Sequence, residues 1–176
     1  MQPSIFVVGL MDNQDEEVKQ MADFLAMQEE TDAVICIVRV CLTDFEEEYF
    51  PTIESKNTDM SERMPLRDGW LDLPFLSAIC HSNGITKLAL LRMDMLGEKP
   101  LIELCVNYEK RVLVEDVAEA EPIYEKFLGW GDLFGCSSRN DLPNEALKYI
   151  EWIEAIIGLP VCCVTSGLGP GEVILI

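Results

Sequence analysis

The sequence predicts an α/β protein built on a mostly parallel sheet, with flanking helices and one β-hairpin. Two observations lead to this class. Three short runs of apolar and β-branched residues, at 4–10, 33–42 and 86–93, have the composition of strands covered on both faces. Helical periodicity separates the first two runs, and a strand–helix–strand order favours parallel pairing through a crossover helix.

The first helix is predicted over residues 14–29. Val18, Met21, Ala22 and Leu25 recur at the i, i+3, i+4 and i+7 spacing of one helical face. Acidic residues precede this stripe, where the positive end of the helix dipole favours them. The segment therefore predicts an amphipathic helix that packs its apolar face on the sheet.

Two later helices carry end signals. Asp72 is the predicted N-cap of the first, which runs to about residue 82 and stops at Gly84. Asp141 is the predicted N-cap of the second, with Pro143 in its first turn and Gly158 after its end.

The hairpin is expected from residues 101–108 and 111–115, which are separated by two polar residues. Residues 116–140 read as a loop. Two short apolar strands, at 161–164 and 172–176, are predicted to complete the chain.

We expect a single domain over residues 1–176, since this length suits one hydrophobic core. It would comprise a strand–helix–strand start at 1–42, an irregular loop at 43–67 and a third part at 68–176. No apolar run approaches the roughly 20 residues that a membrane helix needs, and the start of the chain lacks a basic signal region. We therefore expect no membrane association and a cytoplasmic location.

The charge is strongly negative, because 13 Lys and Arg face 32 Asp and Glu and give −19. Such a surface repels phosphate backbones, so direct nucleic-acid binding is not expected. It suits either a simply solvated surface or docking on a basic protein. The seven cysteines form no Cys-x-x-Cys pair and accompany a single histidine, so we expect buried thiols and no metal site.

The connection after the first strand is a poor phosphate loop. Such loops need glycines, which let backbone N–H groups approach the phosphates, and usually a lysine. Residues 10–18 contain no glycine, and Asp15, Glu16 and Glu17 place three negative charges where a phosphate would bind. We interpret this segment as structural.

Several motifs occur together in the later part of the chain. They are Gly-Trp-Leu-Asp at 69–72, Ser-Asn-Gly-Ile-Thr-Lys-Leu-Ala-Leu at 82–90, Leu-Arg-Met-Asp-Met-Leu at 91–96, Leu-Cys-Val-Asn-Tyr-Glu at 104–109, Glu-Pro-Ile-Tyr-Glu at 121–125, Gly-Trp at 129–130 and Leu-Pro-Asn-Glu-Ala-Leu-Lys-Tyr-Ile at 142–150. As a set, in this order and spacing, they resemble adenylosuccinate synthetase, the GTP-dependent enzyme that joins aspartate to IMP in purine synthesis. The resemblance covers residues 68–176 and implies a reduced form of that family's P-loop-like fold.

The resemblance also implies a guanine site. Asp94 falls on the family's aspartate that binds the guanine N1 and N2 donors of GTP, and Arg92 replaces a lysine of the family's motif. A carboxylate accepts these two N–H groups and would repel the acceptor edge of adenine. The family's Ser-Thr-Gly-Pro loop also contacts the guanine. Thr165, Ser166 and Gly167 match it, but Leu168 replaces the proline.

The departures from the family are extensive. The family enzyme is more than twice this length, and its catalytic-histidine segment and IMP-binding middle have no counterpart here. Of its arginine-rich aspartate-binding loop, Arg63 and Arg67 remain as relics. Asp15 matches the general base and is the one catalytic relic. GTP and Mg²⁺ are therefore expected as cofactors only if the family's activity is retained.

Three interpretations follow, of which we favour the first. It is a shortened relative, catalytically inactive alone, that keeps the sheet and weak guanine-nucleotide binding, because a shared fold does not carry a function without its site. The second is an active GTP-dependent ligase completed by a partner chain. The third is an acidic protein-interaction module. The partners implied are a guanine nucleotide, a second copy of the chain, a full-length synthetase subunit or a basic protein.

Overall fold

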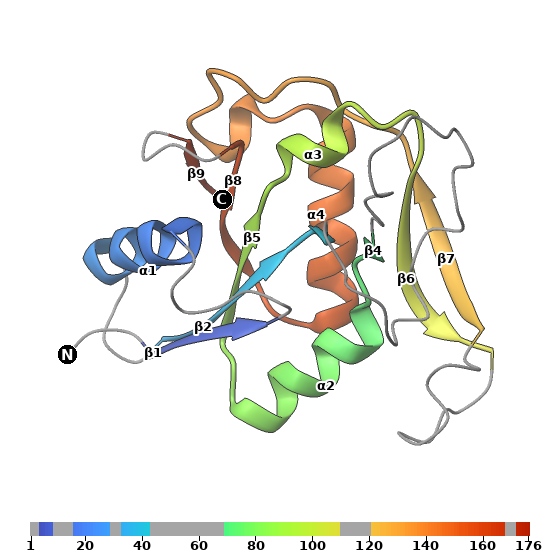
Figure 1. Ribbon diagram of the computed structural model, residues 1–176, viewed down its shortest axis with the longest axis horizontal. Coiled ribbons are helices and arrows are strands. Elements are labelled where there is room, and N and C mark those ends of the chain that lie inside the picture. Colours follow the sequence, from blue (N-terminus) through green and yellow to red (C-terminus); the bar gives the residue numbers. More distant parts are fainter. Residues whose placement is uncertain (1–3, 9–15, 29–32, 43–68, 110–120, 168–171) are drawn as a thin grey trace, which may run out of the picture.

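A five-stranded sheet lies at the centre of the molecule. In the computed structural model its order is β1 (Ser4–Val8), β2 (Val34–Arg39), β5 (Lys87–Leu91), β8 (Val161–Thr165) and β9 (Val173–Leu175) (Figure 1). The first four strands pair in parallel, and β9 runs antiparallel to β8. The predicted α/β class with a mostly parallel sheet is confirmed.

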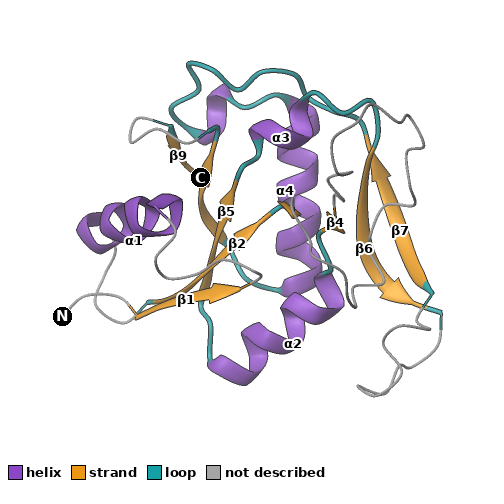
Figure 2. Cartoon of the chain, in the orientation of Figure 1, coloured by secondary structure: helices purple, strands orange, loops and turns teal. Residues whose placement is uncertain are grey.

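The structure describes residues 4–8, 16–28, 33–42, 69–109, 121–167 and 172–176, and the other segments are grey in Figure 2. Three predicted features lie outside these residues. They are the segment before the first helix with Asp15, the irregular segment 43–67 with Arg63 and Arg67, and the strand expected at 111–115.

Helices cover both faces of the sheet. α1 (Glu16–Gln28) lies on one face, while α2 (Leu73–Asn83) and α4 (Asn144–Ile157) lie on the other (Figure 1). Because successive side chains of a strand point to opposite faces, each inner strand contributes to two separate buried clusters. The cluster under α1 contains Val18, Met21, Leu25, Ala33, Ile35, Ile37, Ala89, Leu91 and Cys163.

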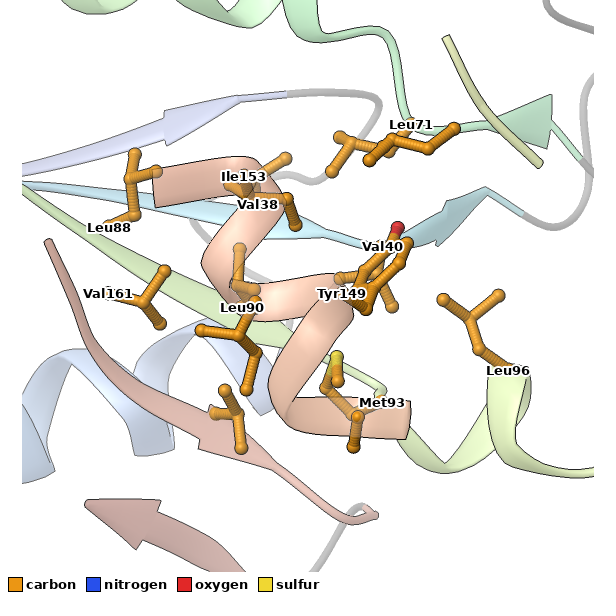
Figure 3. Close-up of a cluster of buried hydrophobic side chains, with 14 of the residues drawn as sticks. Val38, Val40, Leu71, Leu88, Leu90, Met93, Leu96, Tyr149, Ile153 and Val161 are labelled. Atoms are coloured by element: carbon orange, nitrogen blue, oxygen red, sulfur yellow. The ribbon is translucent and has the colours of Figure 1, made fainter. Parts of the chain in front are cut away.

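The larger cluster fills the space between the sheet and α4. Tyr149 and Ile153 project from α4 towards Val38, Leu88 and Leu90 of the inner strands (Figure 3). All five side chains are at most 4% exposed. The apolar stripe predicted for this helix therefore packs on the sheet.

The predicted ends of α2 are confirmed. The Asp72 carboxylate accepts a hydrogen bond of 2.9 Å from the backbone N–H of Phe75, as an N-cap does. Gly84 ends the helix with φ +64°, in the left-handed region that a side chain disfavours.

The predicted start of α4 is wrong by two residues. Pro143 is the N-cap, and Asp141 instead closes a preceding 3-10 helix, Arg139–Asp141. The Asp141 carboxylate accepts hydrogen bonds of 2.9–3.1 Å from the backbone and hydroxyl groups of Ser137 and Ser138. The Asp141 carboxylate therefore caps the turn formed by the preceding serines and not the start of α4. Pro143, in turn, has no backbone N–H that Asp141 could cap.

The prediction that residues 116–140 form a loop is wrong. β6 (Ile102–Tyr108) pairs antiparallel with β7 (Pro122–Phe127), which lies inside the segment expected to be a loop. No residue of β7 is buried, so its sequence lacks the clear apolar alternation of a half-buried strand. Packing decides its place, because Phe127 stacks edge-on against Tyr149 of α4 at a centroid distance of 5.3 Å.

Short elements complete the described chain. β3 (Cys41–Leu42) pairs antiparallel with β4 (Gly69–Trp70), and α3 (Asp94–Gly97) begins shortly after the end of β5. Gly97 is required here, since a Cβ at this position would collide with the backbone carbonyl of Gly131. Within the described chain, every helix is too short or too polar to cross a membrane.

Candidate functional site

Charged and polar side chains gather at the carboxyl ends of the parallel strands. Arg39 ends β2, Arg92 follows β5, and Thr165 ends β8. Residues Arg39 and Leu91 are register partners in adjacent strands, so the two arginines come out at the same edge of the sheet. In open α/β sheets this edge is the usual place for ligand binding.

The backbone at Arg92 adopts an unusual conformation. Its φ of +65° is left-handed, and it is the one such non-glycine residue in the described part of the chain. Such a conformation costs an L-residue roughly 1–2 kcal/mol. Two hydrogen bonds to β8 hold the turn: Arg92 N–H donates to the Thr165 hydroxyl at 2.8 Å, and Met93 N–H donates to the Thr165 carbonyl at 2.9 Å.

The Arg92 guanidinium holds the Asp94 carboxylate with two hydrogen bonds. Arg92 Nε lies 3.1 Å from Asp94 Oδ1, and a terminal nitrogen lies 3.2 Å from Oδ2. This fork geometry engages both carboxylate oxygens. Asp94 was predicted to accept the two N–H donors of a guanine, and Arg92 already supplies two donors to the same atoms.

Glu17, in the first turn of α1, joins this pair to Arg39. One Glu17 oxygen accepts a hydrogen bond of 3.2 Å from Arg92, and the other accepts one of 3.0 Å from Arg39. The result is a line of alternating charge, Arg39–Glu17–Arg92–Asp94, which we call the ion-pair chain. Its side chains are 15–31% exposed. Burial alone would lower the pKa of Arg92, but the hydrogen bonds and charges of Asp94 and Glu17 outweigh it and raise that pKa.

The loop after β8 brings a further acid to the site. Glu172 accepts hydrogen bonds on its backbone carbonyl from Ser166, from the N–H at 2.9 Å and from the hydroxyl at 3.3 Å. Its carboxylate lies in the space that a Cβ on Gly167 would need. Gly167 therefore permits a close approach between the end of β8 and the start of β9.

A pocket of about 240 Å³ lies beside the ion-pair chain, between α1 and the strand ends. The described residues that line it include no Lys or Arg, and two acids, Glu17 and Asp23, stand in its wall. The full lining is Glu17, Gln20, Met21, Asp23, Phe24, Met27, Leu91, Thr165, Gly167 and Val173. An apolar pocket with acidic walls attracts cations or neutral molecules and repels phosphate.

The structure thus brings the five residues predicted for guanine binding into one region, while Asp15, Arg63 and Arg67 lie outside the described residues. The sequence did not indicate that Arg39 belongs to this region. It indicated Glu17 only as a negative charge that would repel a phosphate. The available signal was positional, because an arginine that ends a buried parallel strand points to the ligand edge of the sheet.

A parallel sheet with a helix N-terminus and polar side chains at its carboxyl edge defines the α/β class that binds ligands at strand ends. The family model of adenylosuccinate synthetase matches residues 27–174, and the chain belongs to that family.

Relatives of the same name support the assignment. The adenylosuccinate synthetase of Halothermothrix orenii is 32% identical over 163 residues, which cover 80% of this chain and 37% of that protein. The Acetivibrio thermocellus protein is 38% identical over 112 residues, 58% of this chain and 26% of its own. The fully ligated adenylosuccinate synthetase structure from Plasmodium falciparum has a TM-score of 0.72 and 26% identity, over 89% of this chain and 43% of that one. The chain therefore spans well under half the length of these relatives.

Proposed function

We propose that this chain is a shortened adenylosuccinate synthetase relative that has no ligase activity alone and keeps a weakened guanine-recognition site. The site residues are Asp94, Arg92 and the loop Thr165, Ser166 and Gly167. The proposal rests on the ion-pair chain, because the groups that would hold a nucleotide make contacts with one another instead. Both carboxylate oxygens of Asp94 accept hydrogen bonds from Arg92.

The position of Glu17 supports the loss of triphosphate binding. A helix N-terminus attracts anions, since its unpaired N–H groups and dipole are positive. Here the first turn of α1 already carries Glu16 and Glu17, and Glu17 neutralises the two arginines that face it. A phosphate approaching this end of α1 meets a carboxylate instead of free cations.

A magnesium ion has no fitting site among these groups. Mg²⁺ is usually held by one or two carboxylates together with the phosphates of a substrate. The two carboxylates at the strand edge, Glu17 and Asp94, are engaged by arginines. We expect the protein to act in purine metabolism in the cytoplasm without catalysing ligation alone.

Isothermal calorimetry with guanosine, GTP and adenosine tests the proposal. We expect weak binding of guanosine, no binding of adenosine, and no gain in affinity from the phosphates of GTP. Asp94→Asn should abolish guanosine binding, whereas Glu121→Gln should not change it, because Glu121 is exposed and lies next to β7 in the separate two-stranded sheet. Tight GTP binding that Asp94→Asn leaves unchanged would refute the proposed pocket.

Two other functions are tested alongside. An active ligase completed by a partner chain would form succinyl-purine product when GTP, IMP and aspartate are supplied with a longer synthetase subunit. A docking role is favoured by exposed apolar side chains on α4 and in the loop after β7, since Trp152 is 41% and Phe134 88% exposed. Size-exclusion chromatography with light scattering, alone and with a longer subunit, distinguishes a free monomer from a homodimer or mixed complex.

A further inference from the structure

The pairing of β5 with β8 contains an irregularity that reorients two adjacent cysteines. Leu88 pairs with Val161, but the next residue, Ala89, pairs with Cys163. Cys162 is therefore an extra residue on β8, as in a β-bulge. In a regular strand Cys162 and Cys163 would point to opposite faces.

The bulge places both thiols on the face of the sheet that α1 covers. Val161 and Val164 pack in the cluster under α4, whereas Cys162 and Cys163 both pack in the cluster under α1. Their sulfur atoms lie 3.9 Å apart. Met21 of α1 reaches down to the same point, with its sulfur 3.5 Å from that of Cys163.

We propose that Cys162, Cys163 and Met21 bind one soft monovalent cation of the Cu(I) type in a three-coordinate sulfur site. Soft thiolate and thioether ligands select such ions. For a metal–sulfur bond of about 2.3 Å, a planar three-sulfur site needs sulfur–sulfur distances of about 4.0 Å. The two distances that the structure fixes, 3.9 and 3.5 Å, are close to this value.

The surroundings suit a cation and disfavour other metals. Cys163 and Met21 are at most 1% exposed, while Cys162 is partly exposed and offers a route for entry. Met21 also lines the acidic pocket described above, so the local field draws cations to this place. Zinc would need four ligands of the thiolate, imidazole or carboxylate type.

Binding involves no change of oxidation state. Each thiol loses one proton, two metal–thiolate bonds form, and the neutral Met21 sulfur completes the set, so Cu⁺ with two thiolates carries one negative charge. Cys162 donates a hydrogen bond of 3.2 Å to the Leu88 carbonyl. This bond is lost when the Cys162 thiolate takes the metal. Because two protons are released on binding, affinity should rise with pH.

The test is an anaerobic titration of the whole chain with Cu(I) held by the competing chelator bathocuproine disulfonate. We expect one ion per chain. Cys162→Ser or Cys163→Ser should each lower the affinity by about 100-fold, and Met21→Leu by about tenfold, since ligand and supporting groups contribute on this scale. Cys136→Ser and Cys80→Ser, which leave the site intact, should not change it.

Two results would overturn the proposal. One is retention of Cu(I) affinity in Cys162→Ser, or loss of that affinity in Cys80→Ser, since either result would place the metal elsewhere in the protein. The other comes from X-ray absorption on the loaded wild-type protein, which remains decisive if a variant fails to fold. Three sulfur neighbours at about 2.3 Å are expected, and two sulfurs or any nitrogen or oxygen ligand would contradict the site.

Discussion

Replacing Glu17 by glutamine should destabilise the fold by about 2 kcal/mol, a value between the roughly 0–1 kcal/mol of exposed ion pairs and the 3–5 kcal/mol lost when a buried pair is broken. The intermediate value follows from the structure, since the Glu17 side chain is 15% exposed and its two arginine partners are 20–21% exposed. Glutamine keeps the size of the side chain and removes the charge that both guanidinium groups contact.

Glu16→Gln is the matched control. Glu16 stands in the same turn of α1, so it loses the same favourable interaction with the helix dipole, worth about 0.5 kcal/mol. It is exposed and no ion pair to an arginine is described for it. The difference between the two variants therefore isolates the ion-pair chain.

Urea unfolding followed by circular dichroism measures both variants, and an unchanged slope m shows that the unfolded state is unaffected. In 1 M salt, where the Debye length is about 3 Å, the direct contacts of Glu17 should keep most of the difference. If Glu17→Gln lies within about 0.5 kcal/mol of Glu16→Gln, the ion-pair chain contributes nothing to the fold and the reasoning fails.

Three further outcomes are expected. Gly97→Ala should lower the free energy of unfolding by about 3 kcal/mol or more, because its Cβ meets a backbone carbonyl that cannot move freely, whereas Gly84→Ala, with open space and only a positive φ, should lose about 1 kcal/mol in the same urea assay. Burial is the main cause that raises the pKa of the Cys105 thiol from 9.0 to about 12, so the folded state retains a proton that the unfolded state loses. The free energy of unfolding should therefore fall as the pH rises from 9.0 towards 12. A Cys105→Ala variant with the same dependence of stability on pH would contradict this. Hydrogen bonding, first from the Ser137 backbone N–H and then from the Ser138 hydroxyl, lowers the pKa of Asp141 below 3.8. Its stabilising effect is therefore present above that pH and is lost as the pH falls. A carboxyl NMR titration should show the low pKa, Ser138→Ala should raise it by removing the hydroxyl, and an unshifted wild-type value would count against the capping geometry.

Much of the fold could be predicted because its signals are local or periodic. The apolar runs of β2 and β5 show burial on both faces, and the stripe of α1 has helical spacing. The caps of α2 are local hydrogen bonds and a left-handed glycine, which residue type alone makes predictable. The ordered motifs of residues 68–176 were enough to indicate the family, which the comparisons bear out.

Contacts between distant segments could not be predicted from the sequence. The strand at Pro122–Phe127 was missed because packing on α4 places it, while its own alternation is weak. The ion-pair chain joins side chains up to 75 positions apart, and no local pattern couples them. The same holds for the sulfur cluster, where the composition showed only adjacent cysteines.

What the sequence by itself determined is the class of the protein, its family, and the presence of an aspartate and an arginine after a buried strand. Only the tertiary structure decided what those residues do. The carboxyl ends of parallel strands lie at one edge of the sheet, whatever separates the strands in the chain. The charged side chains there form ion pairs with one another, namely Arg39, Glu17, Arg92 and Asp94. A one-residue bulge in β8 likewise decides that two neighbouring thiols share a face.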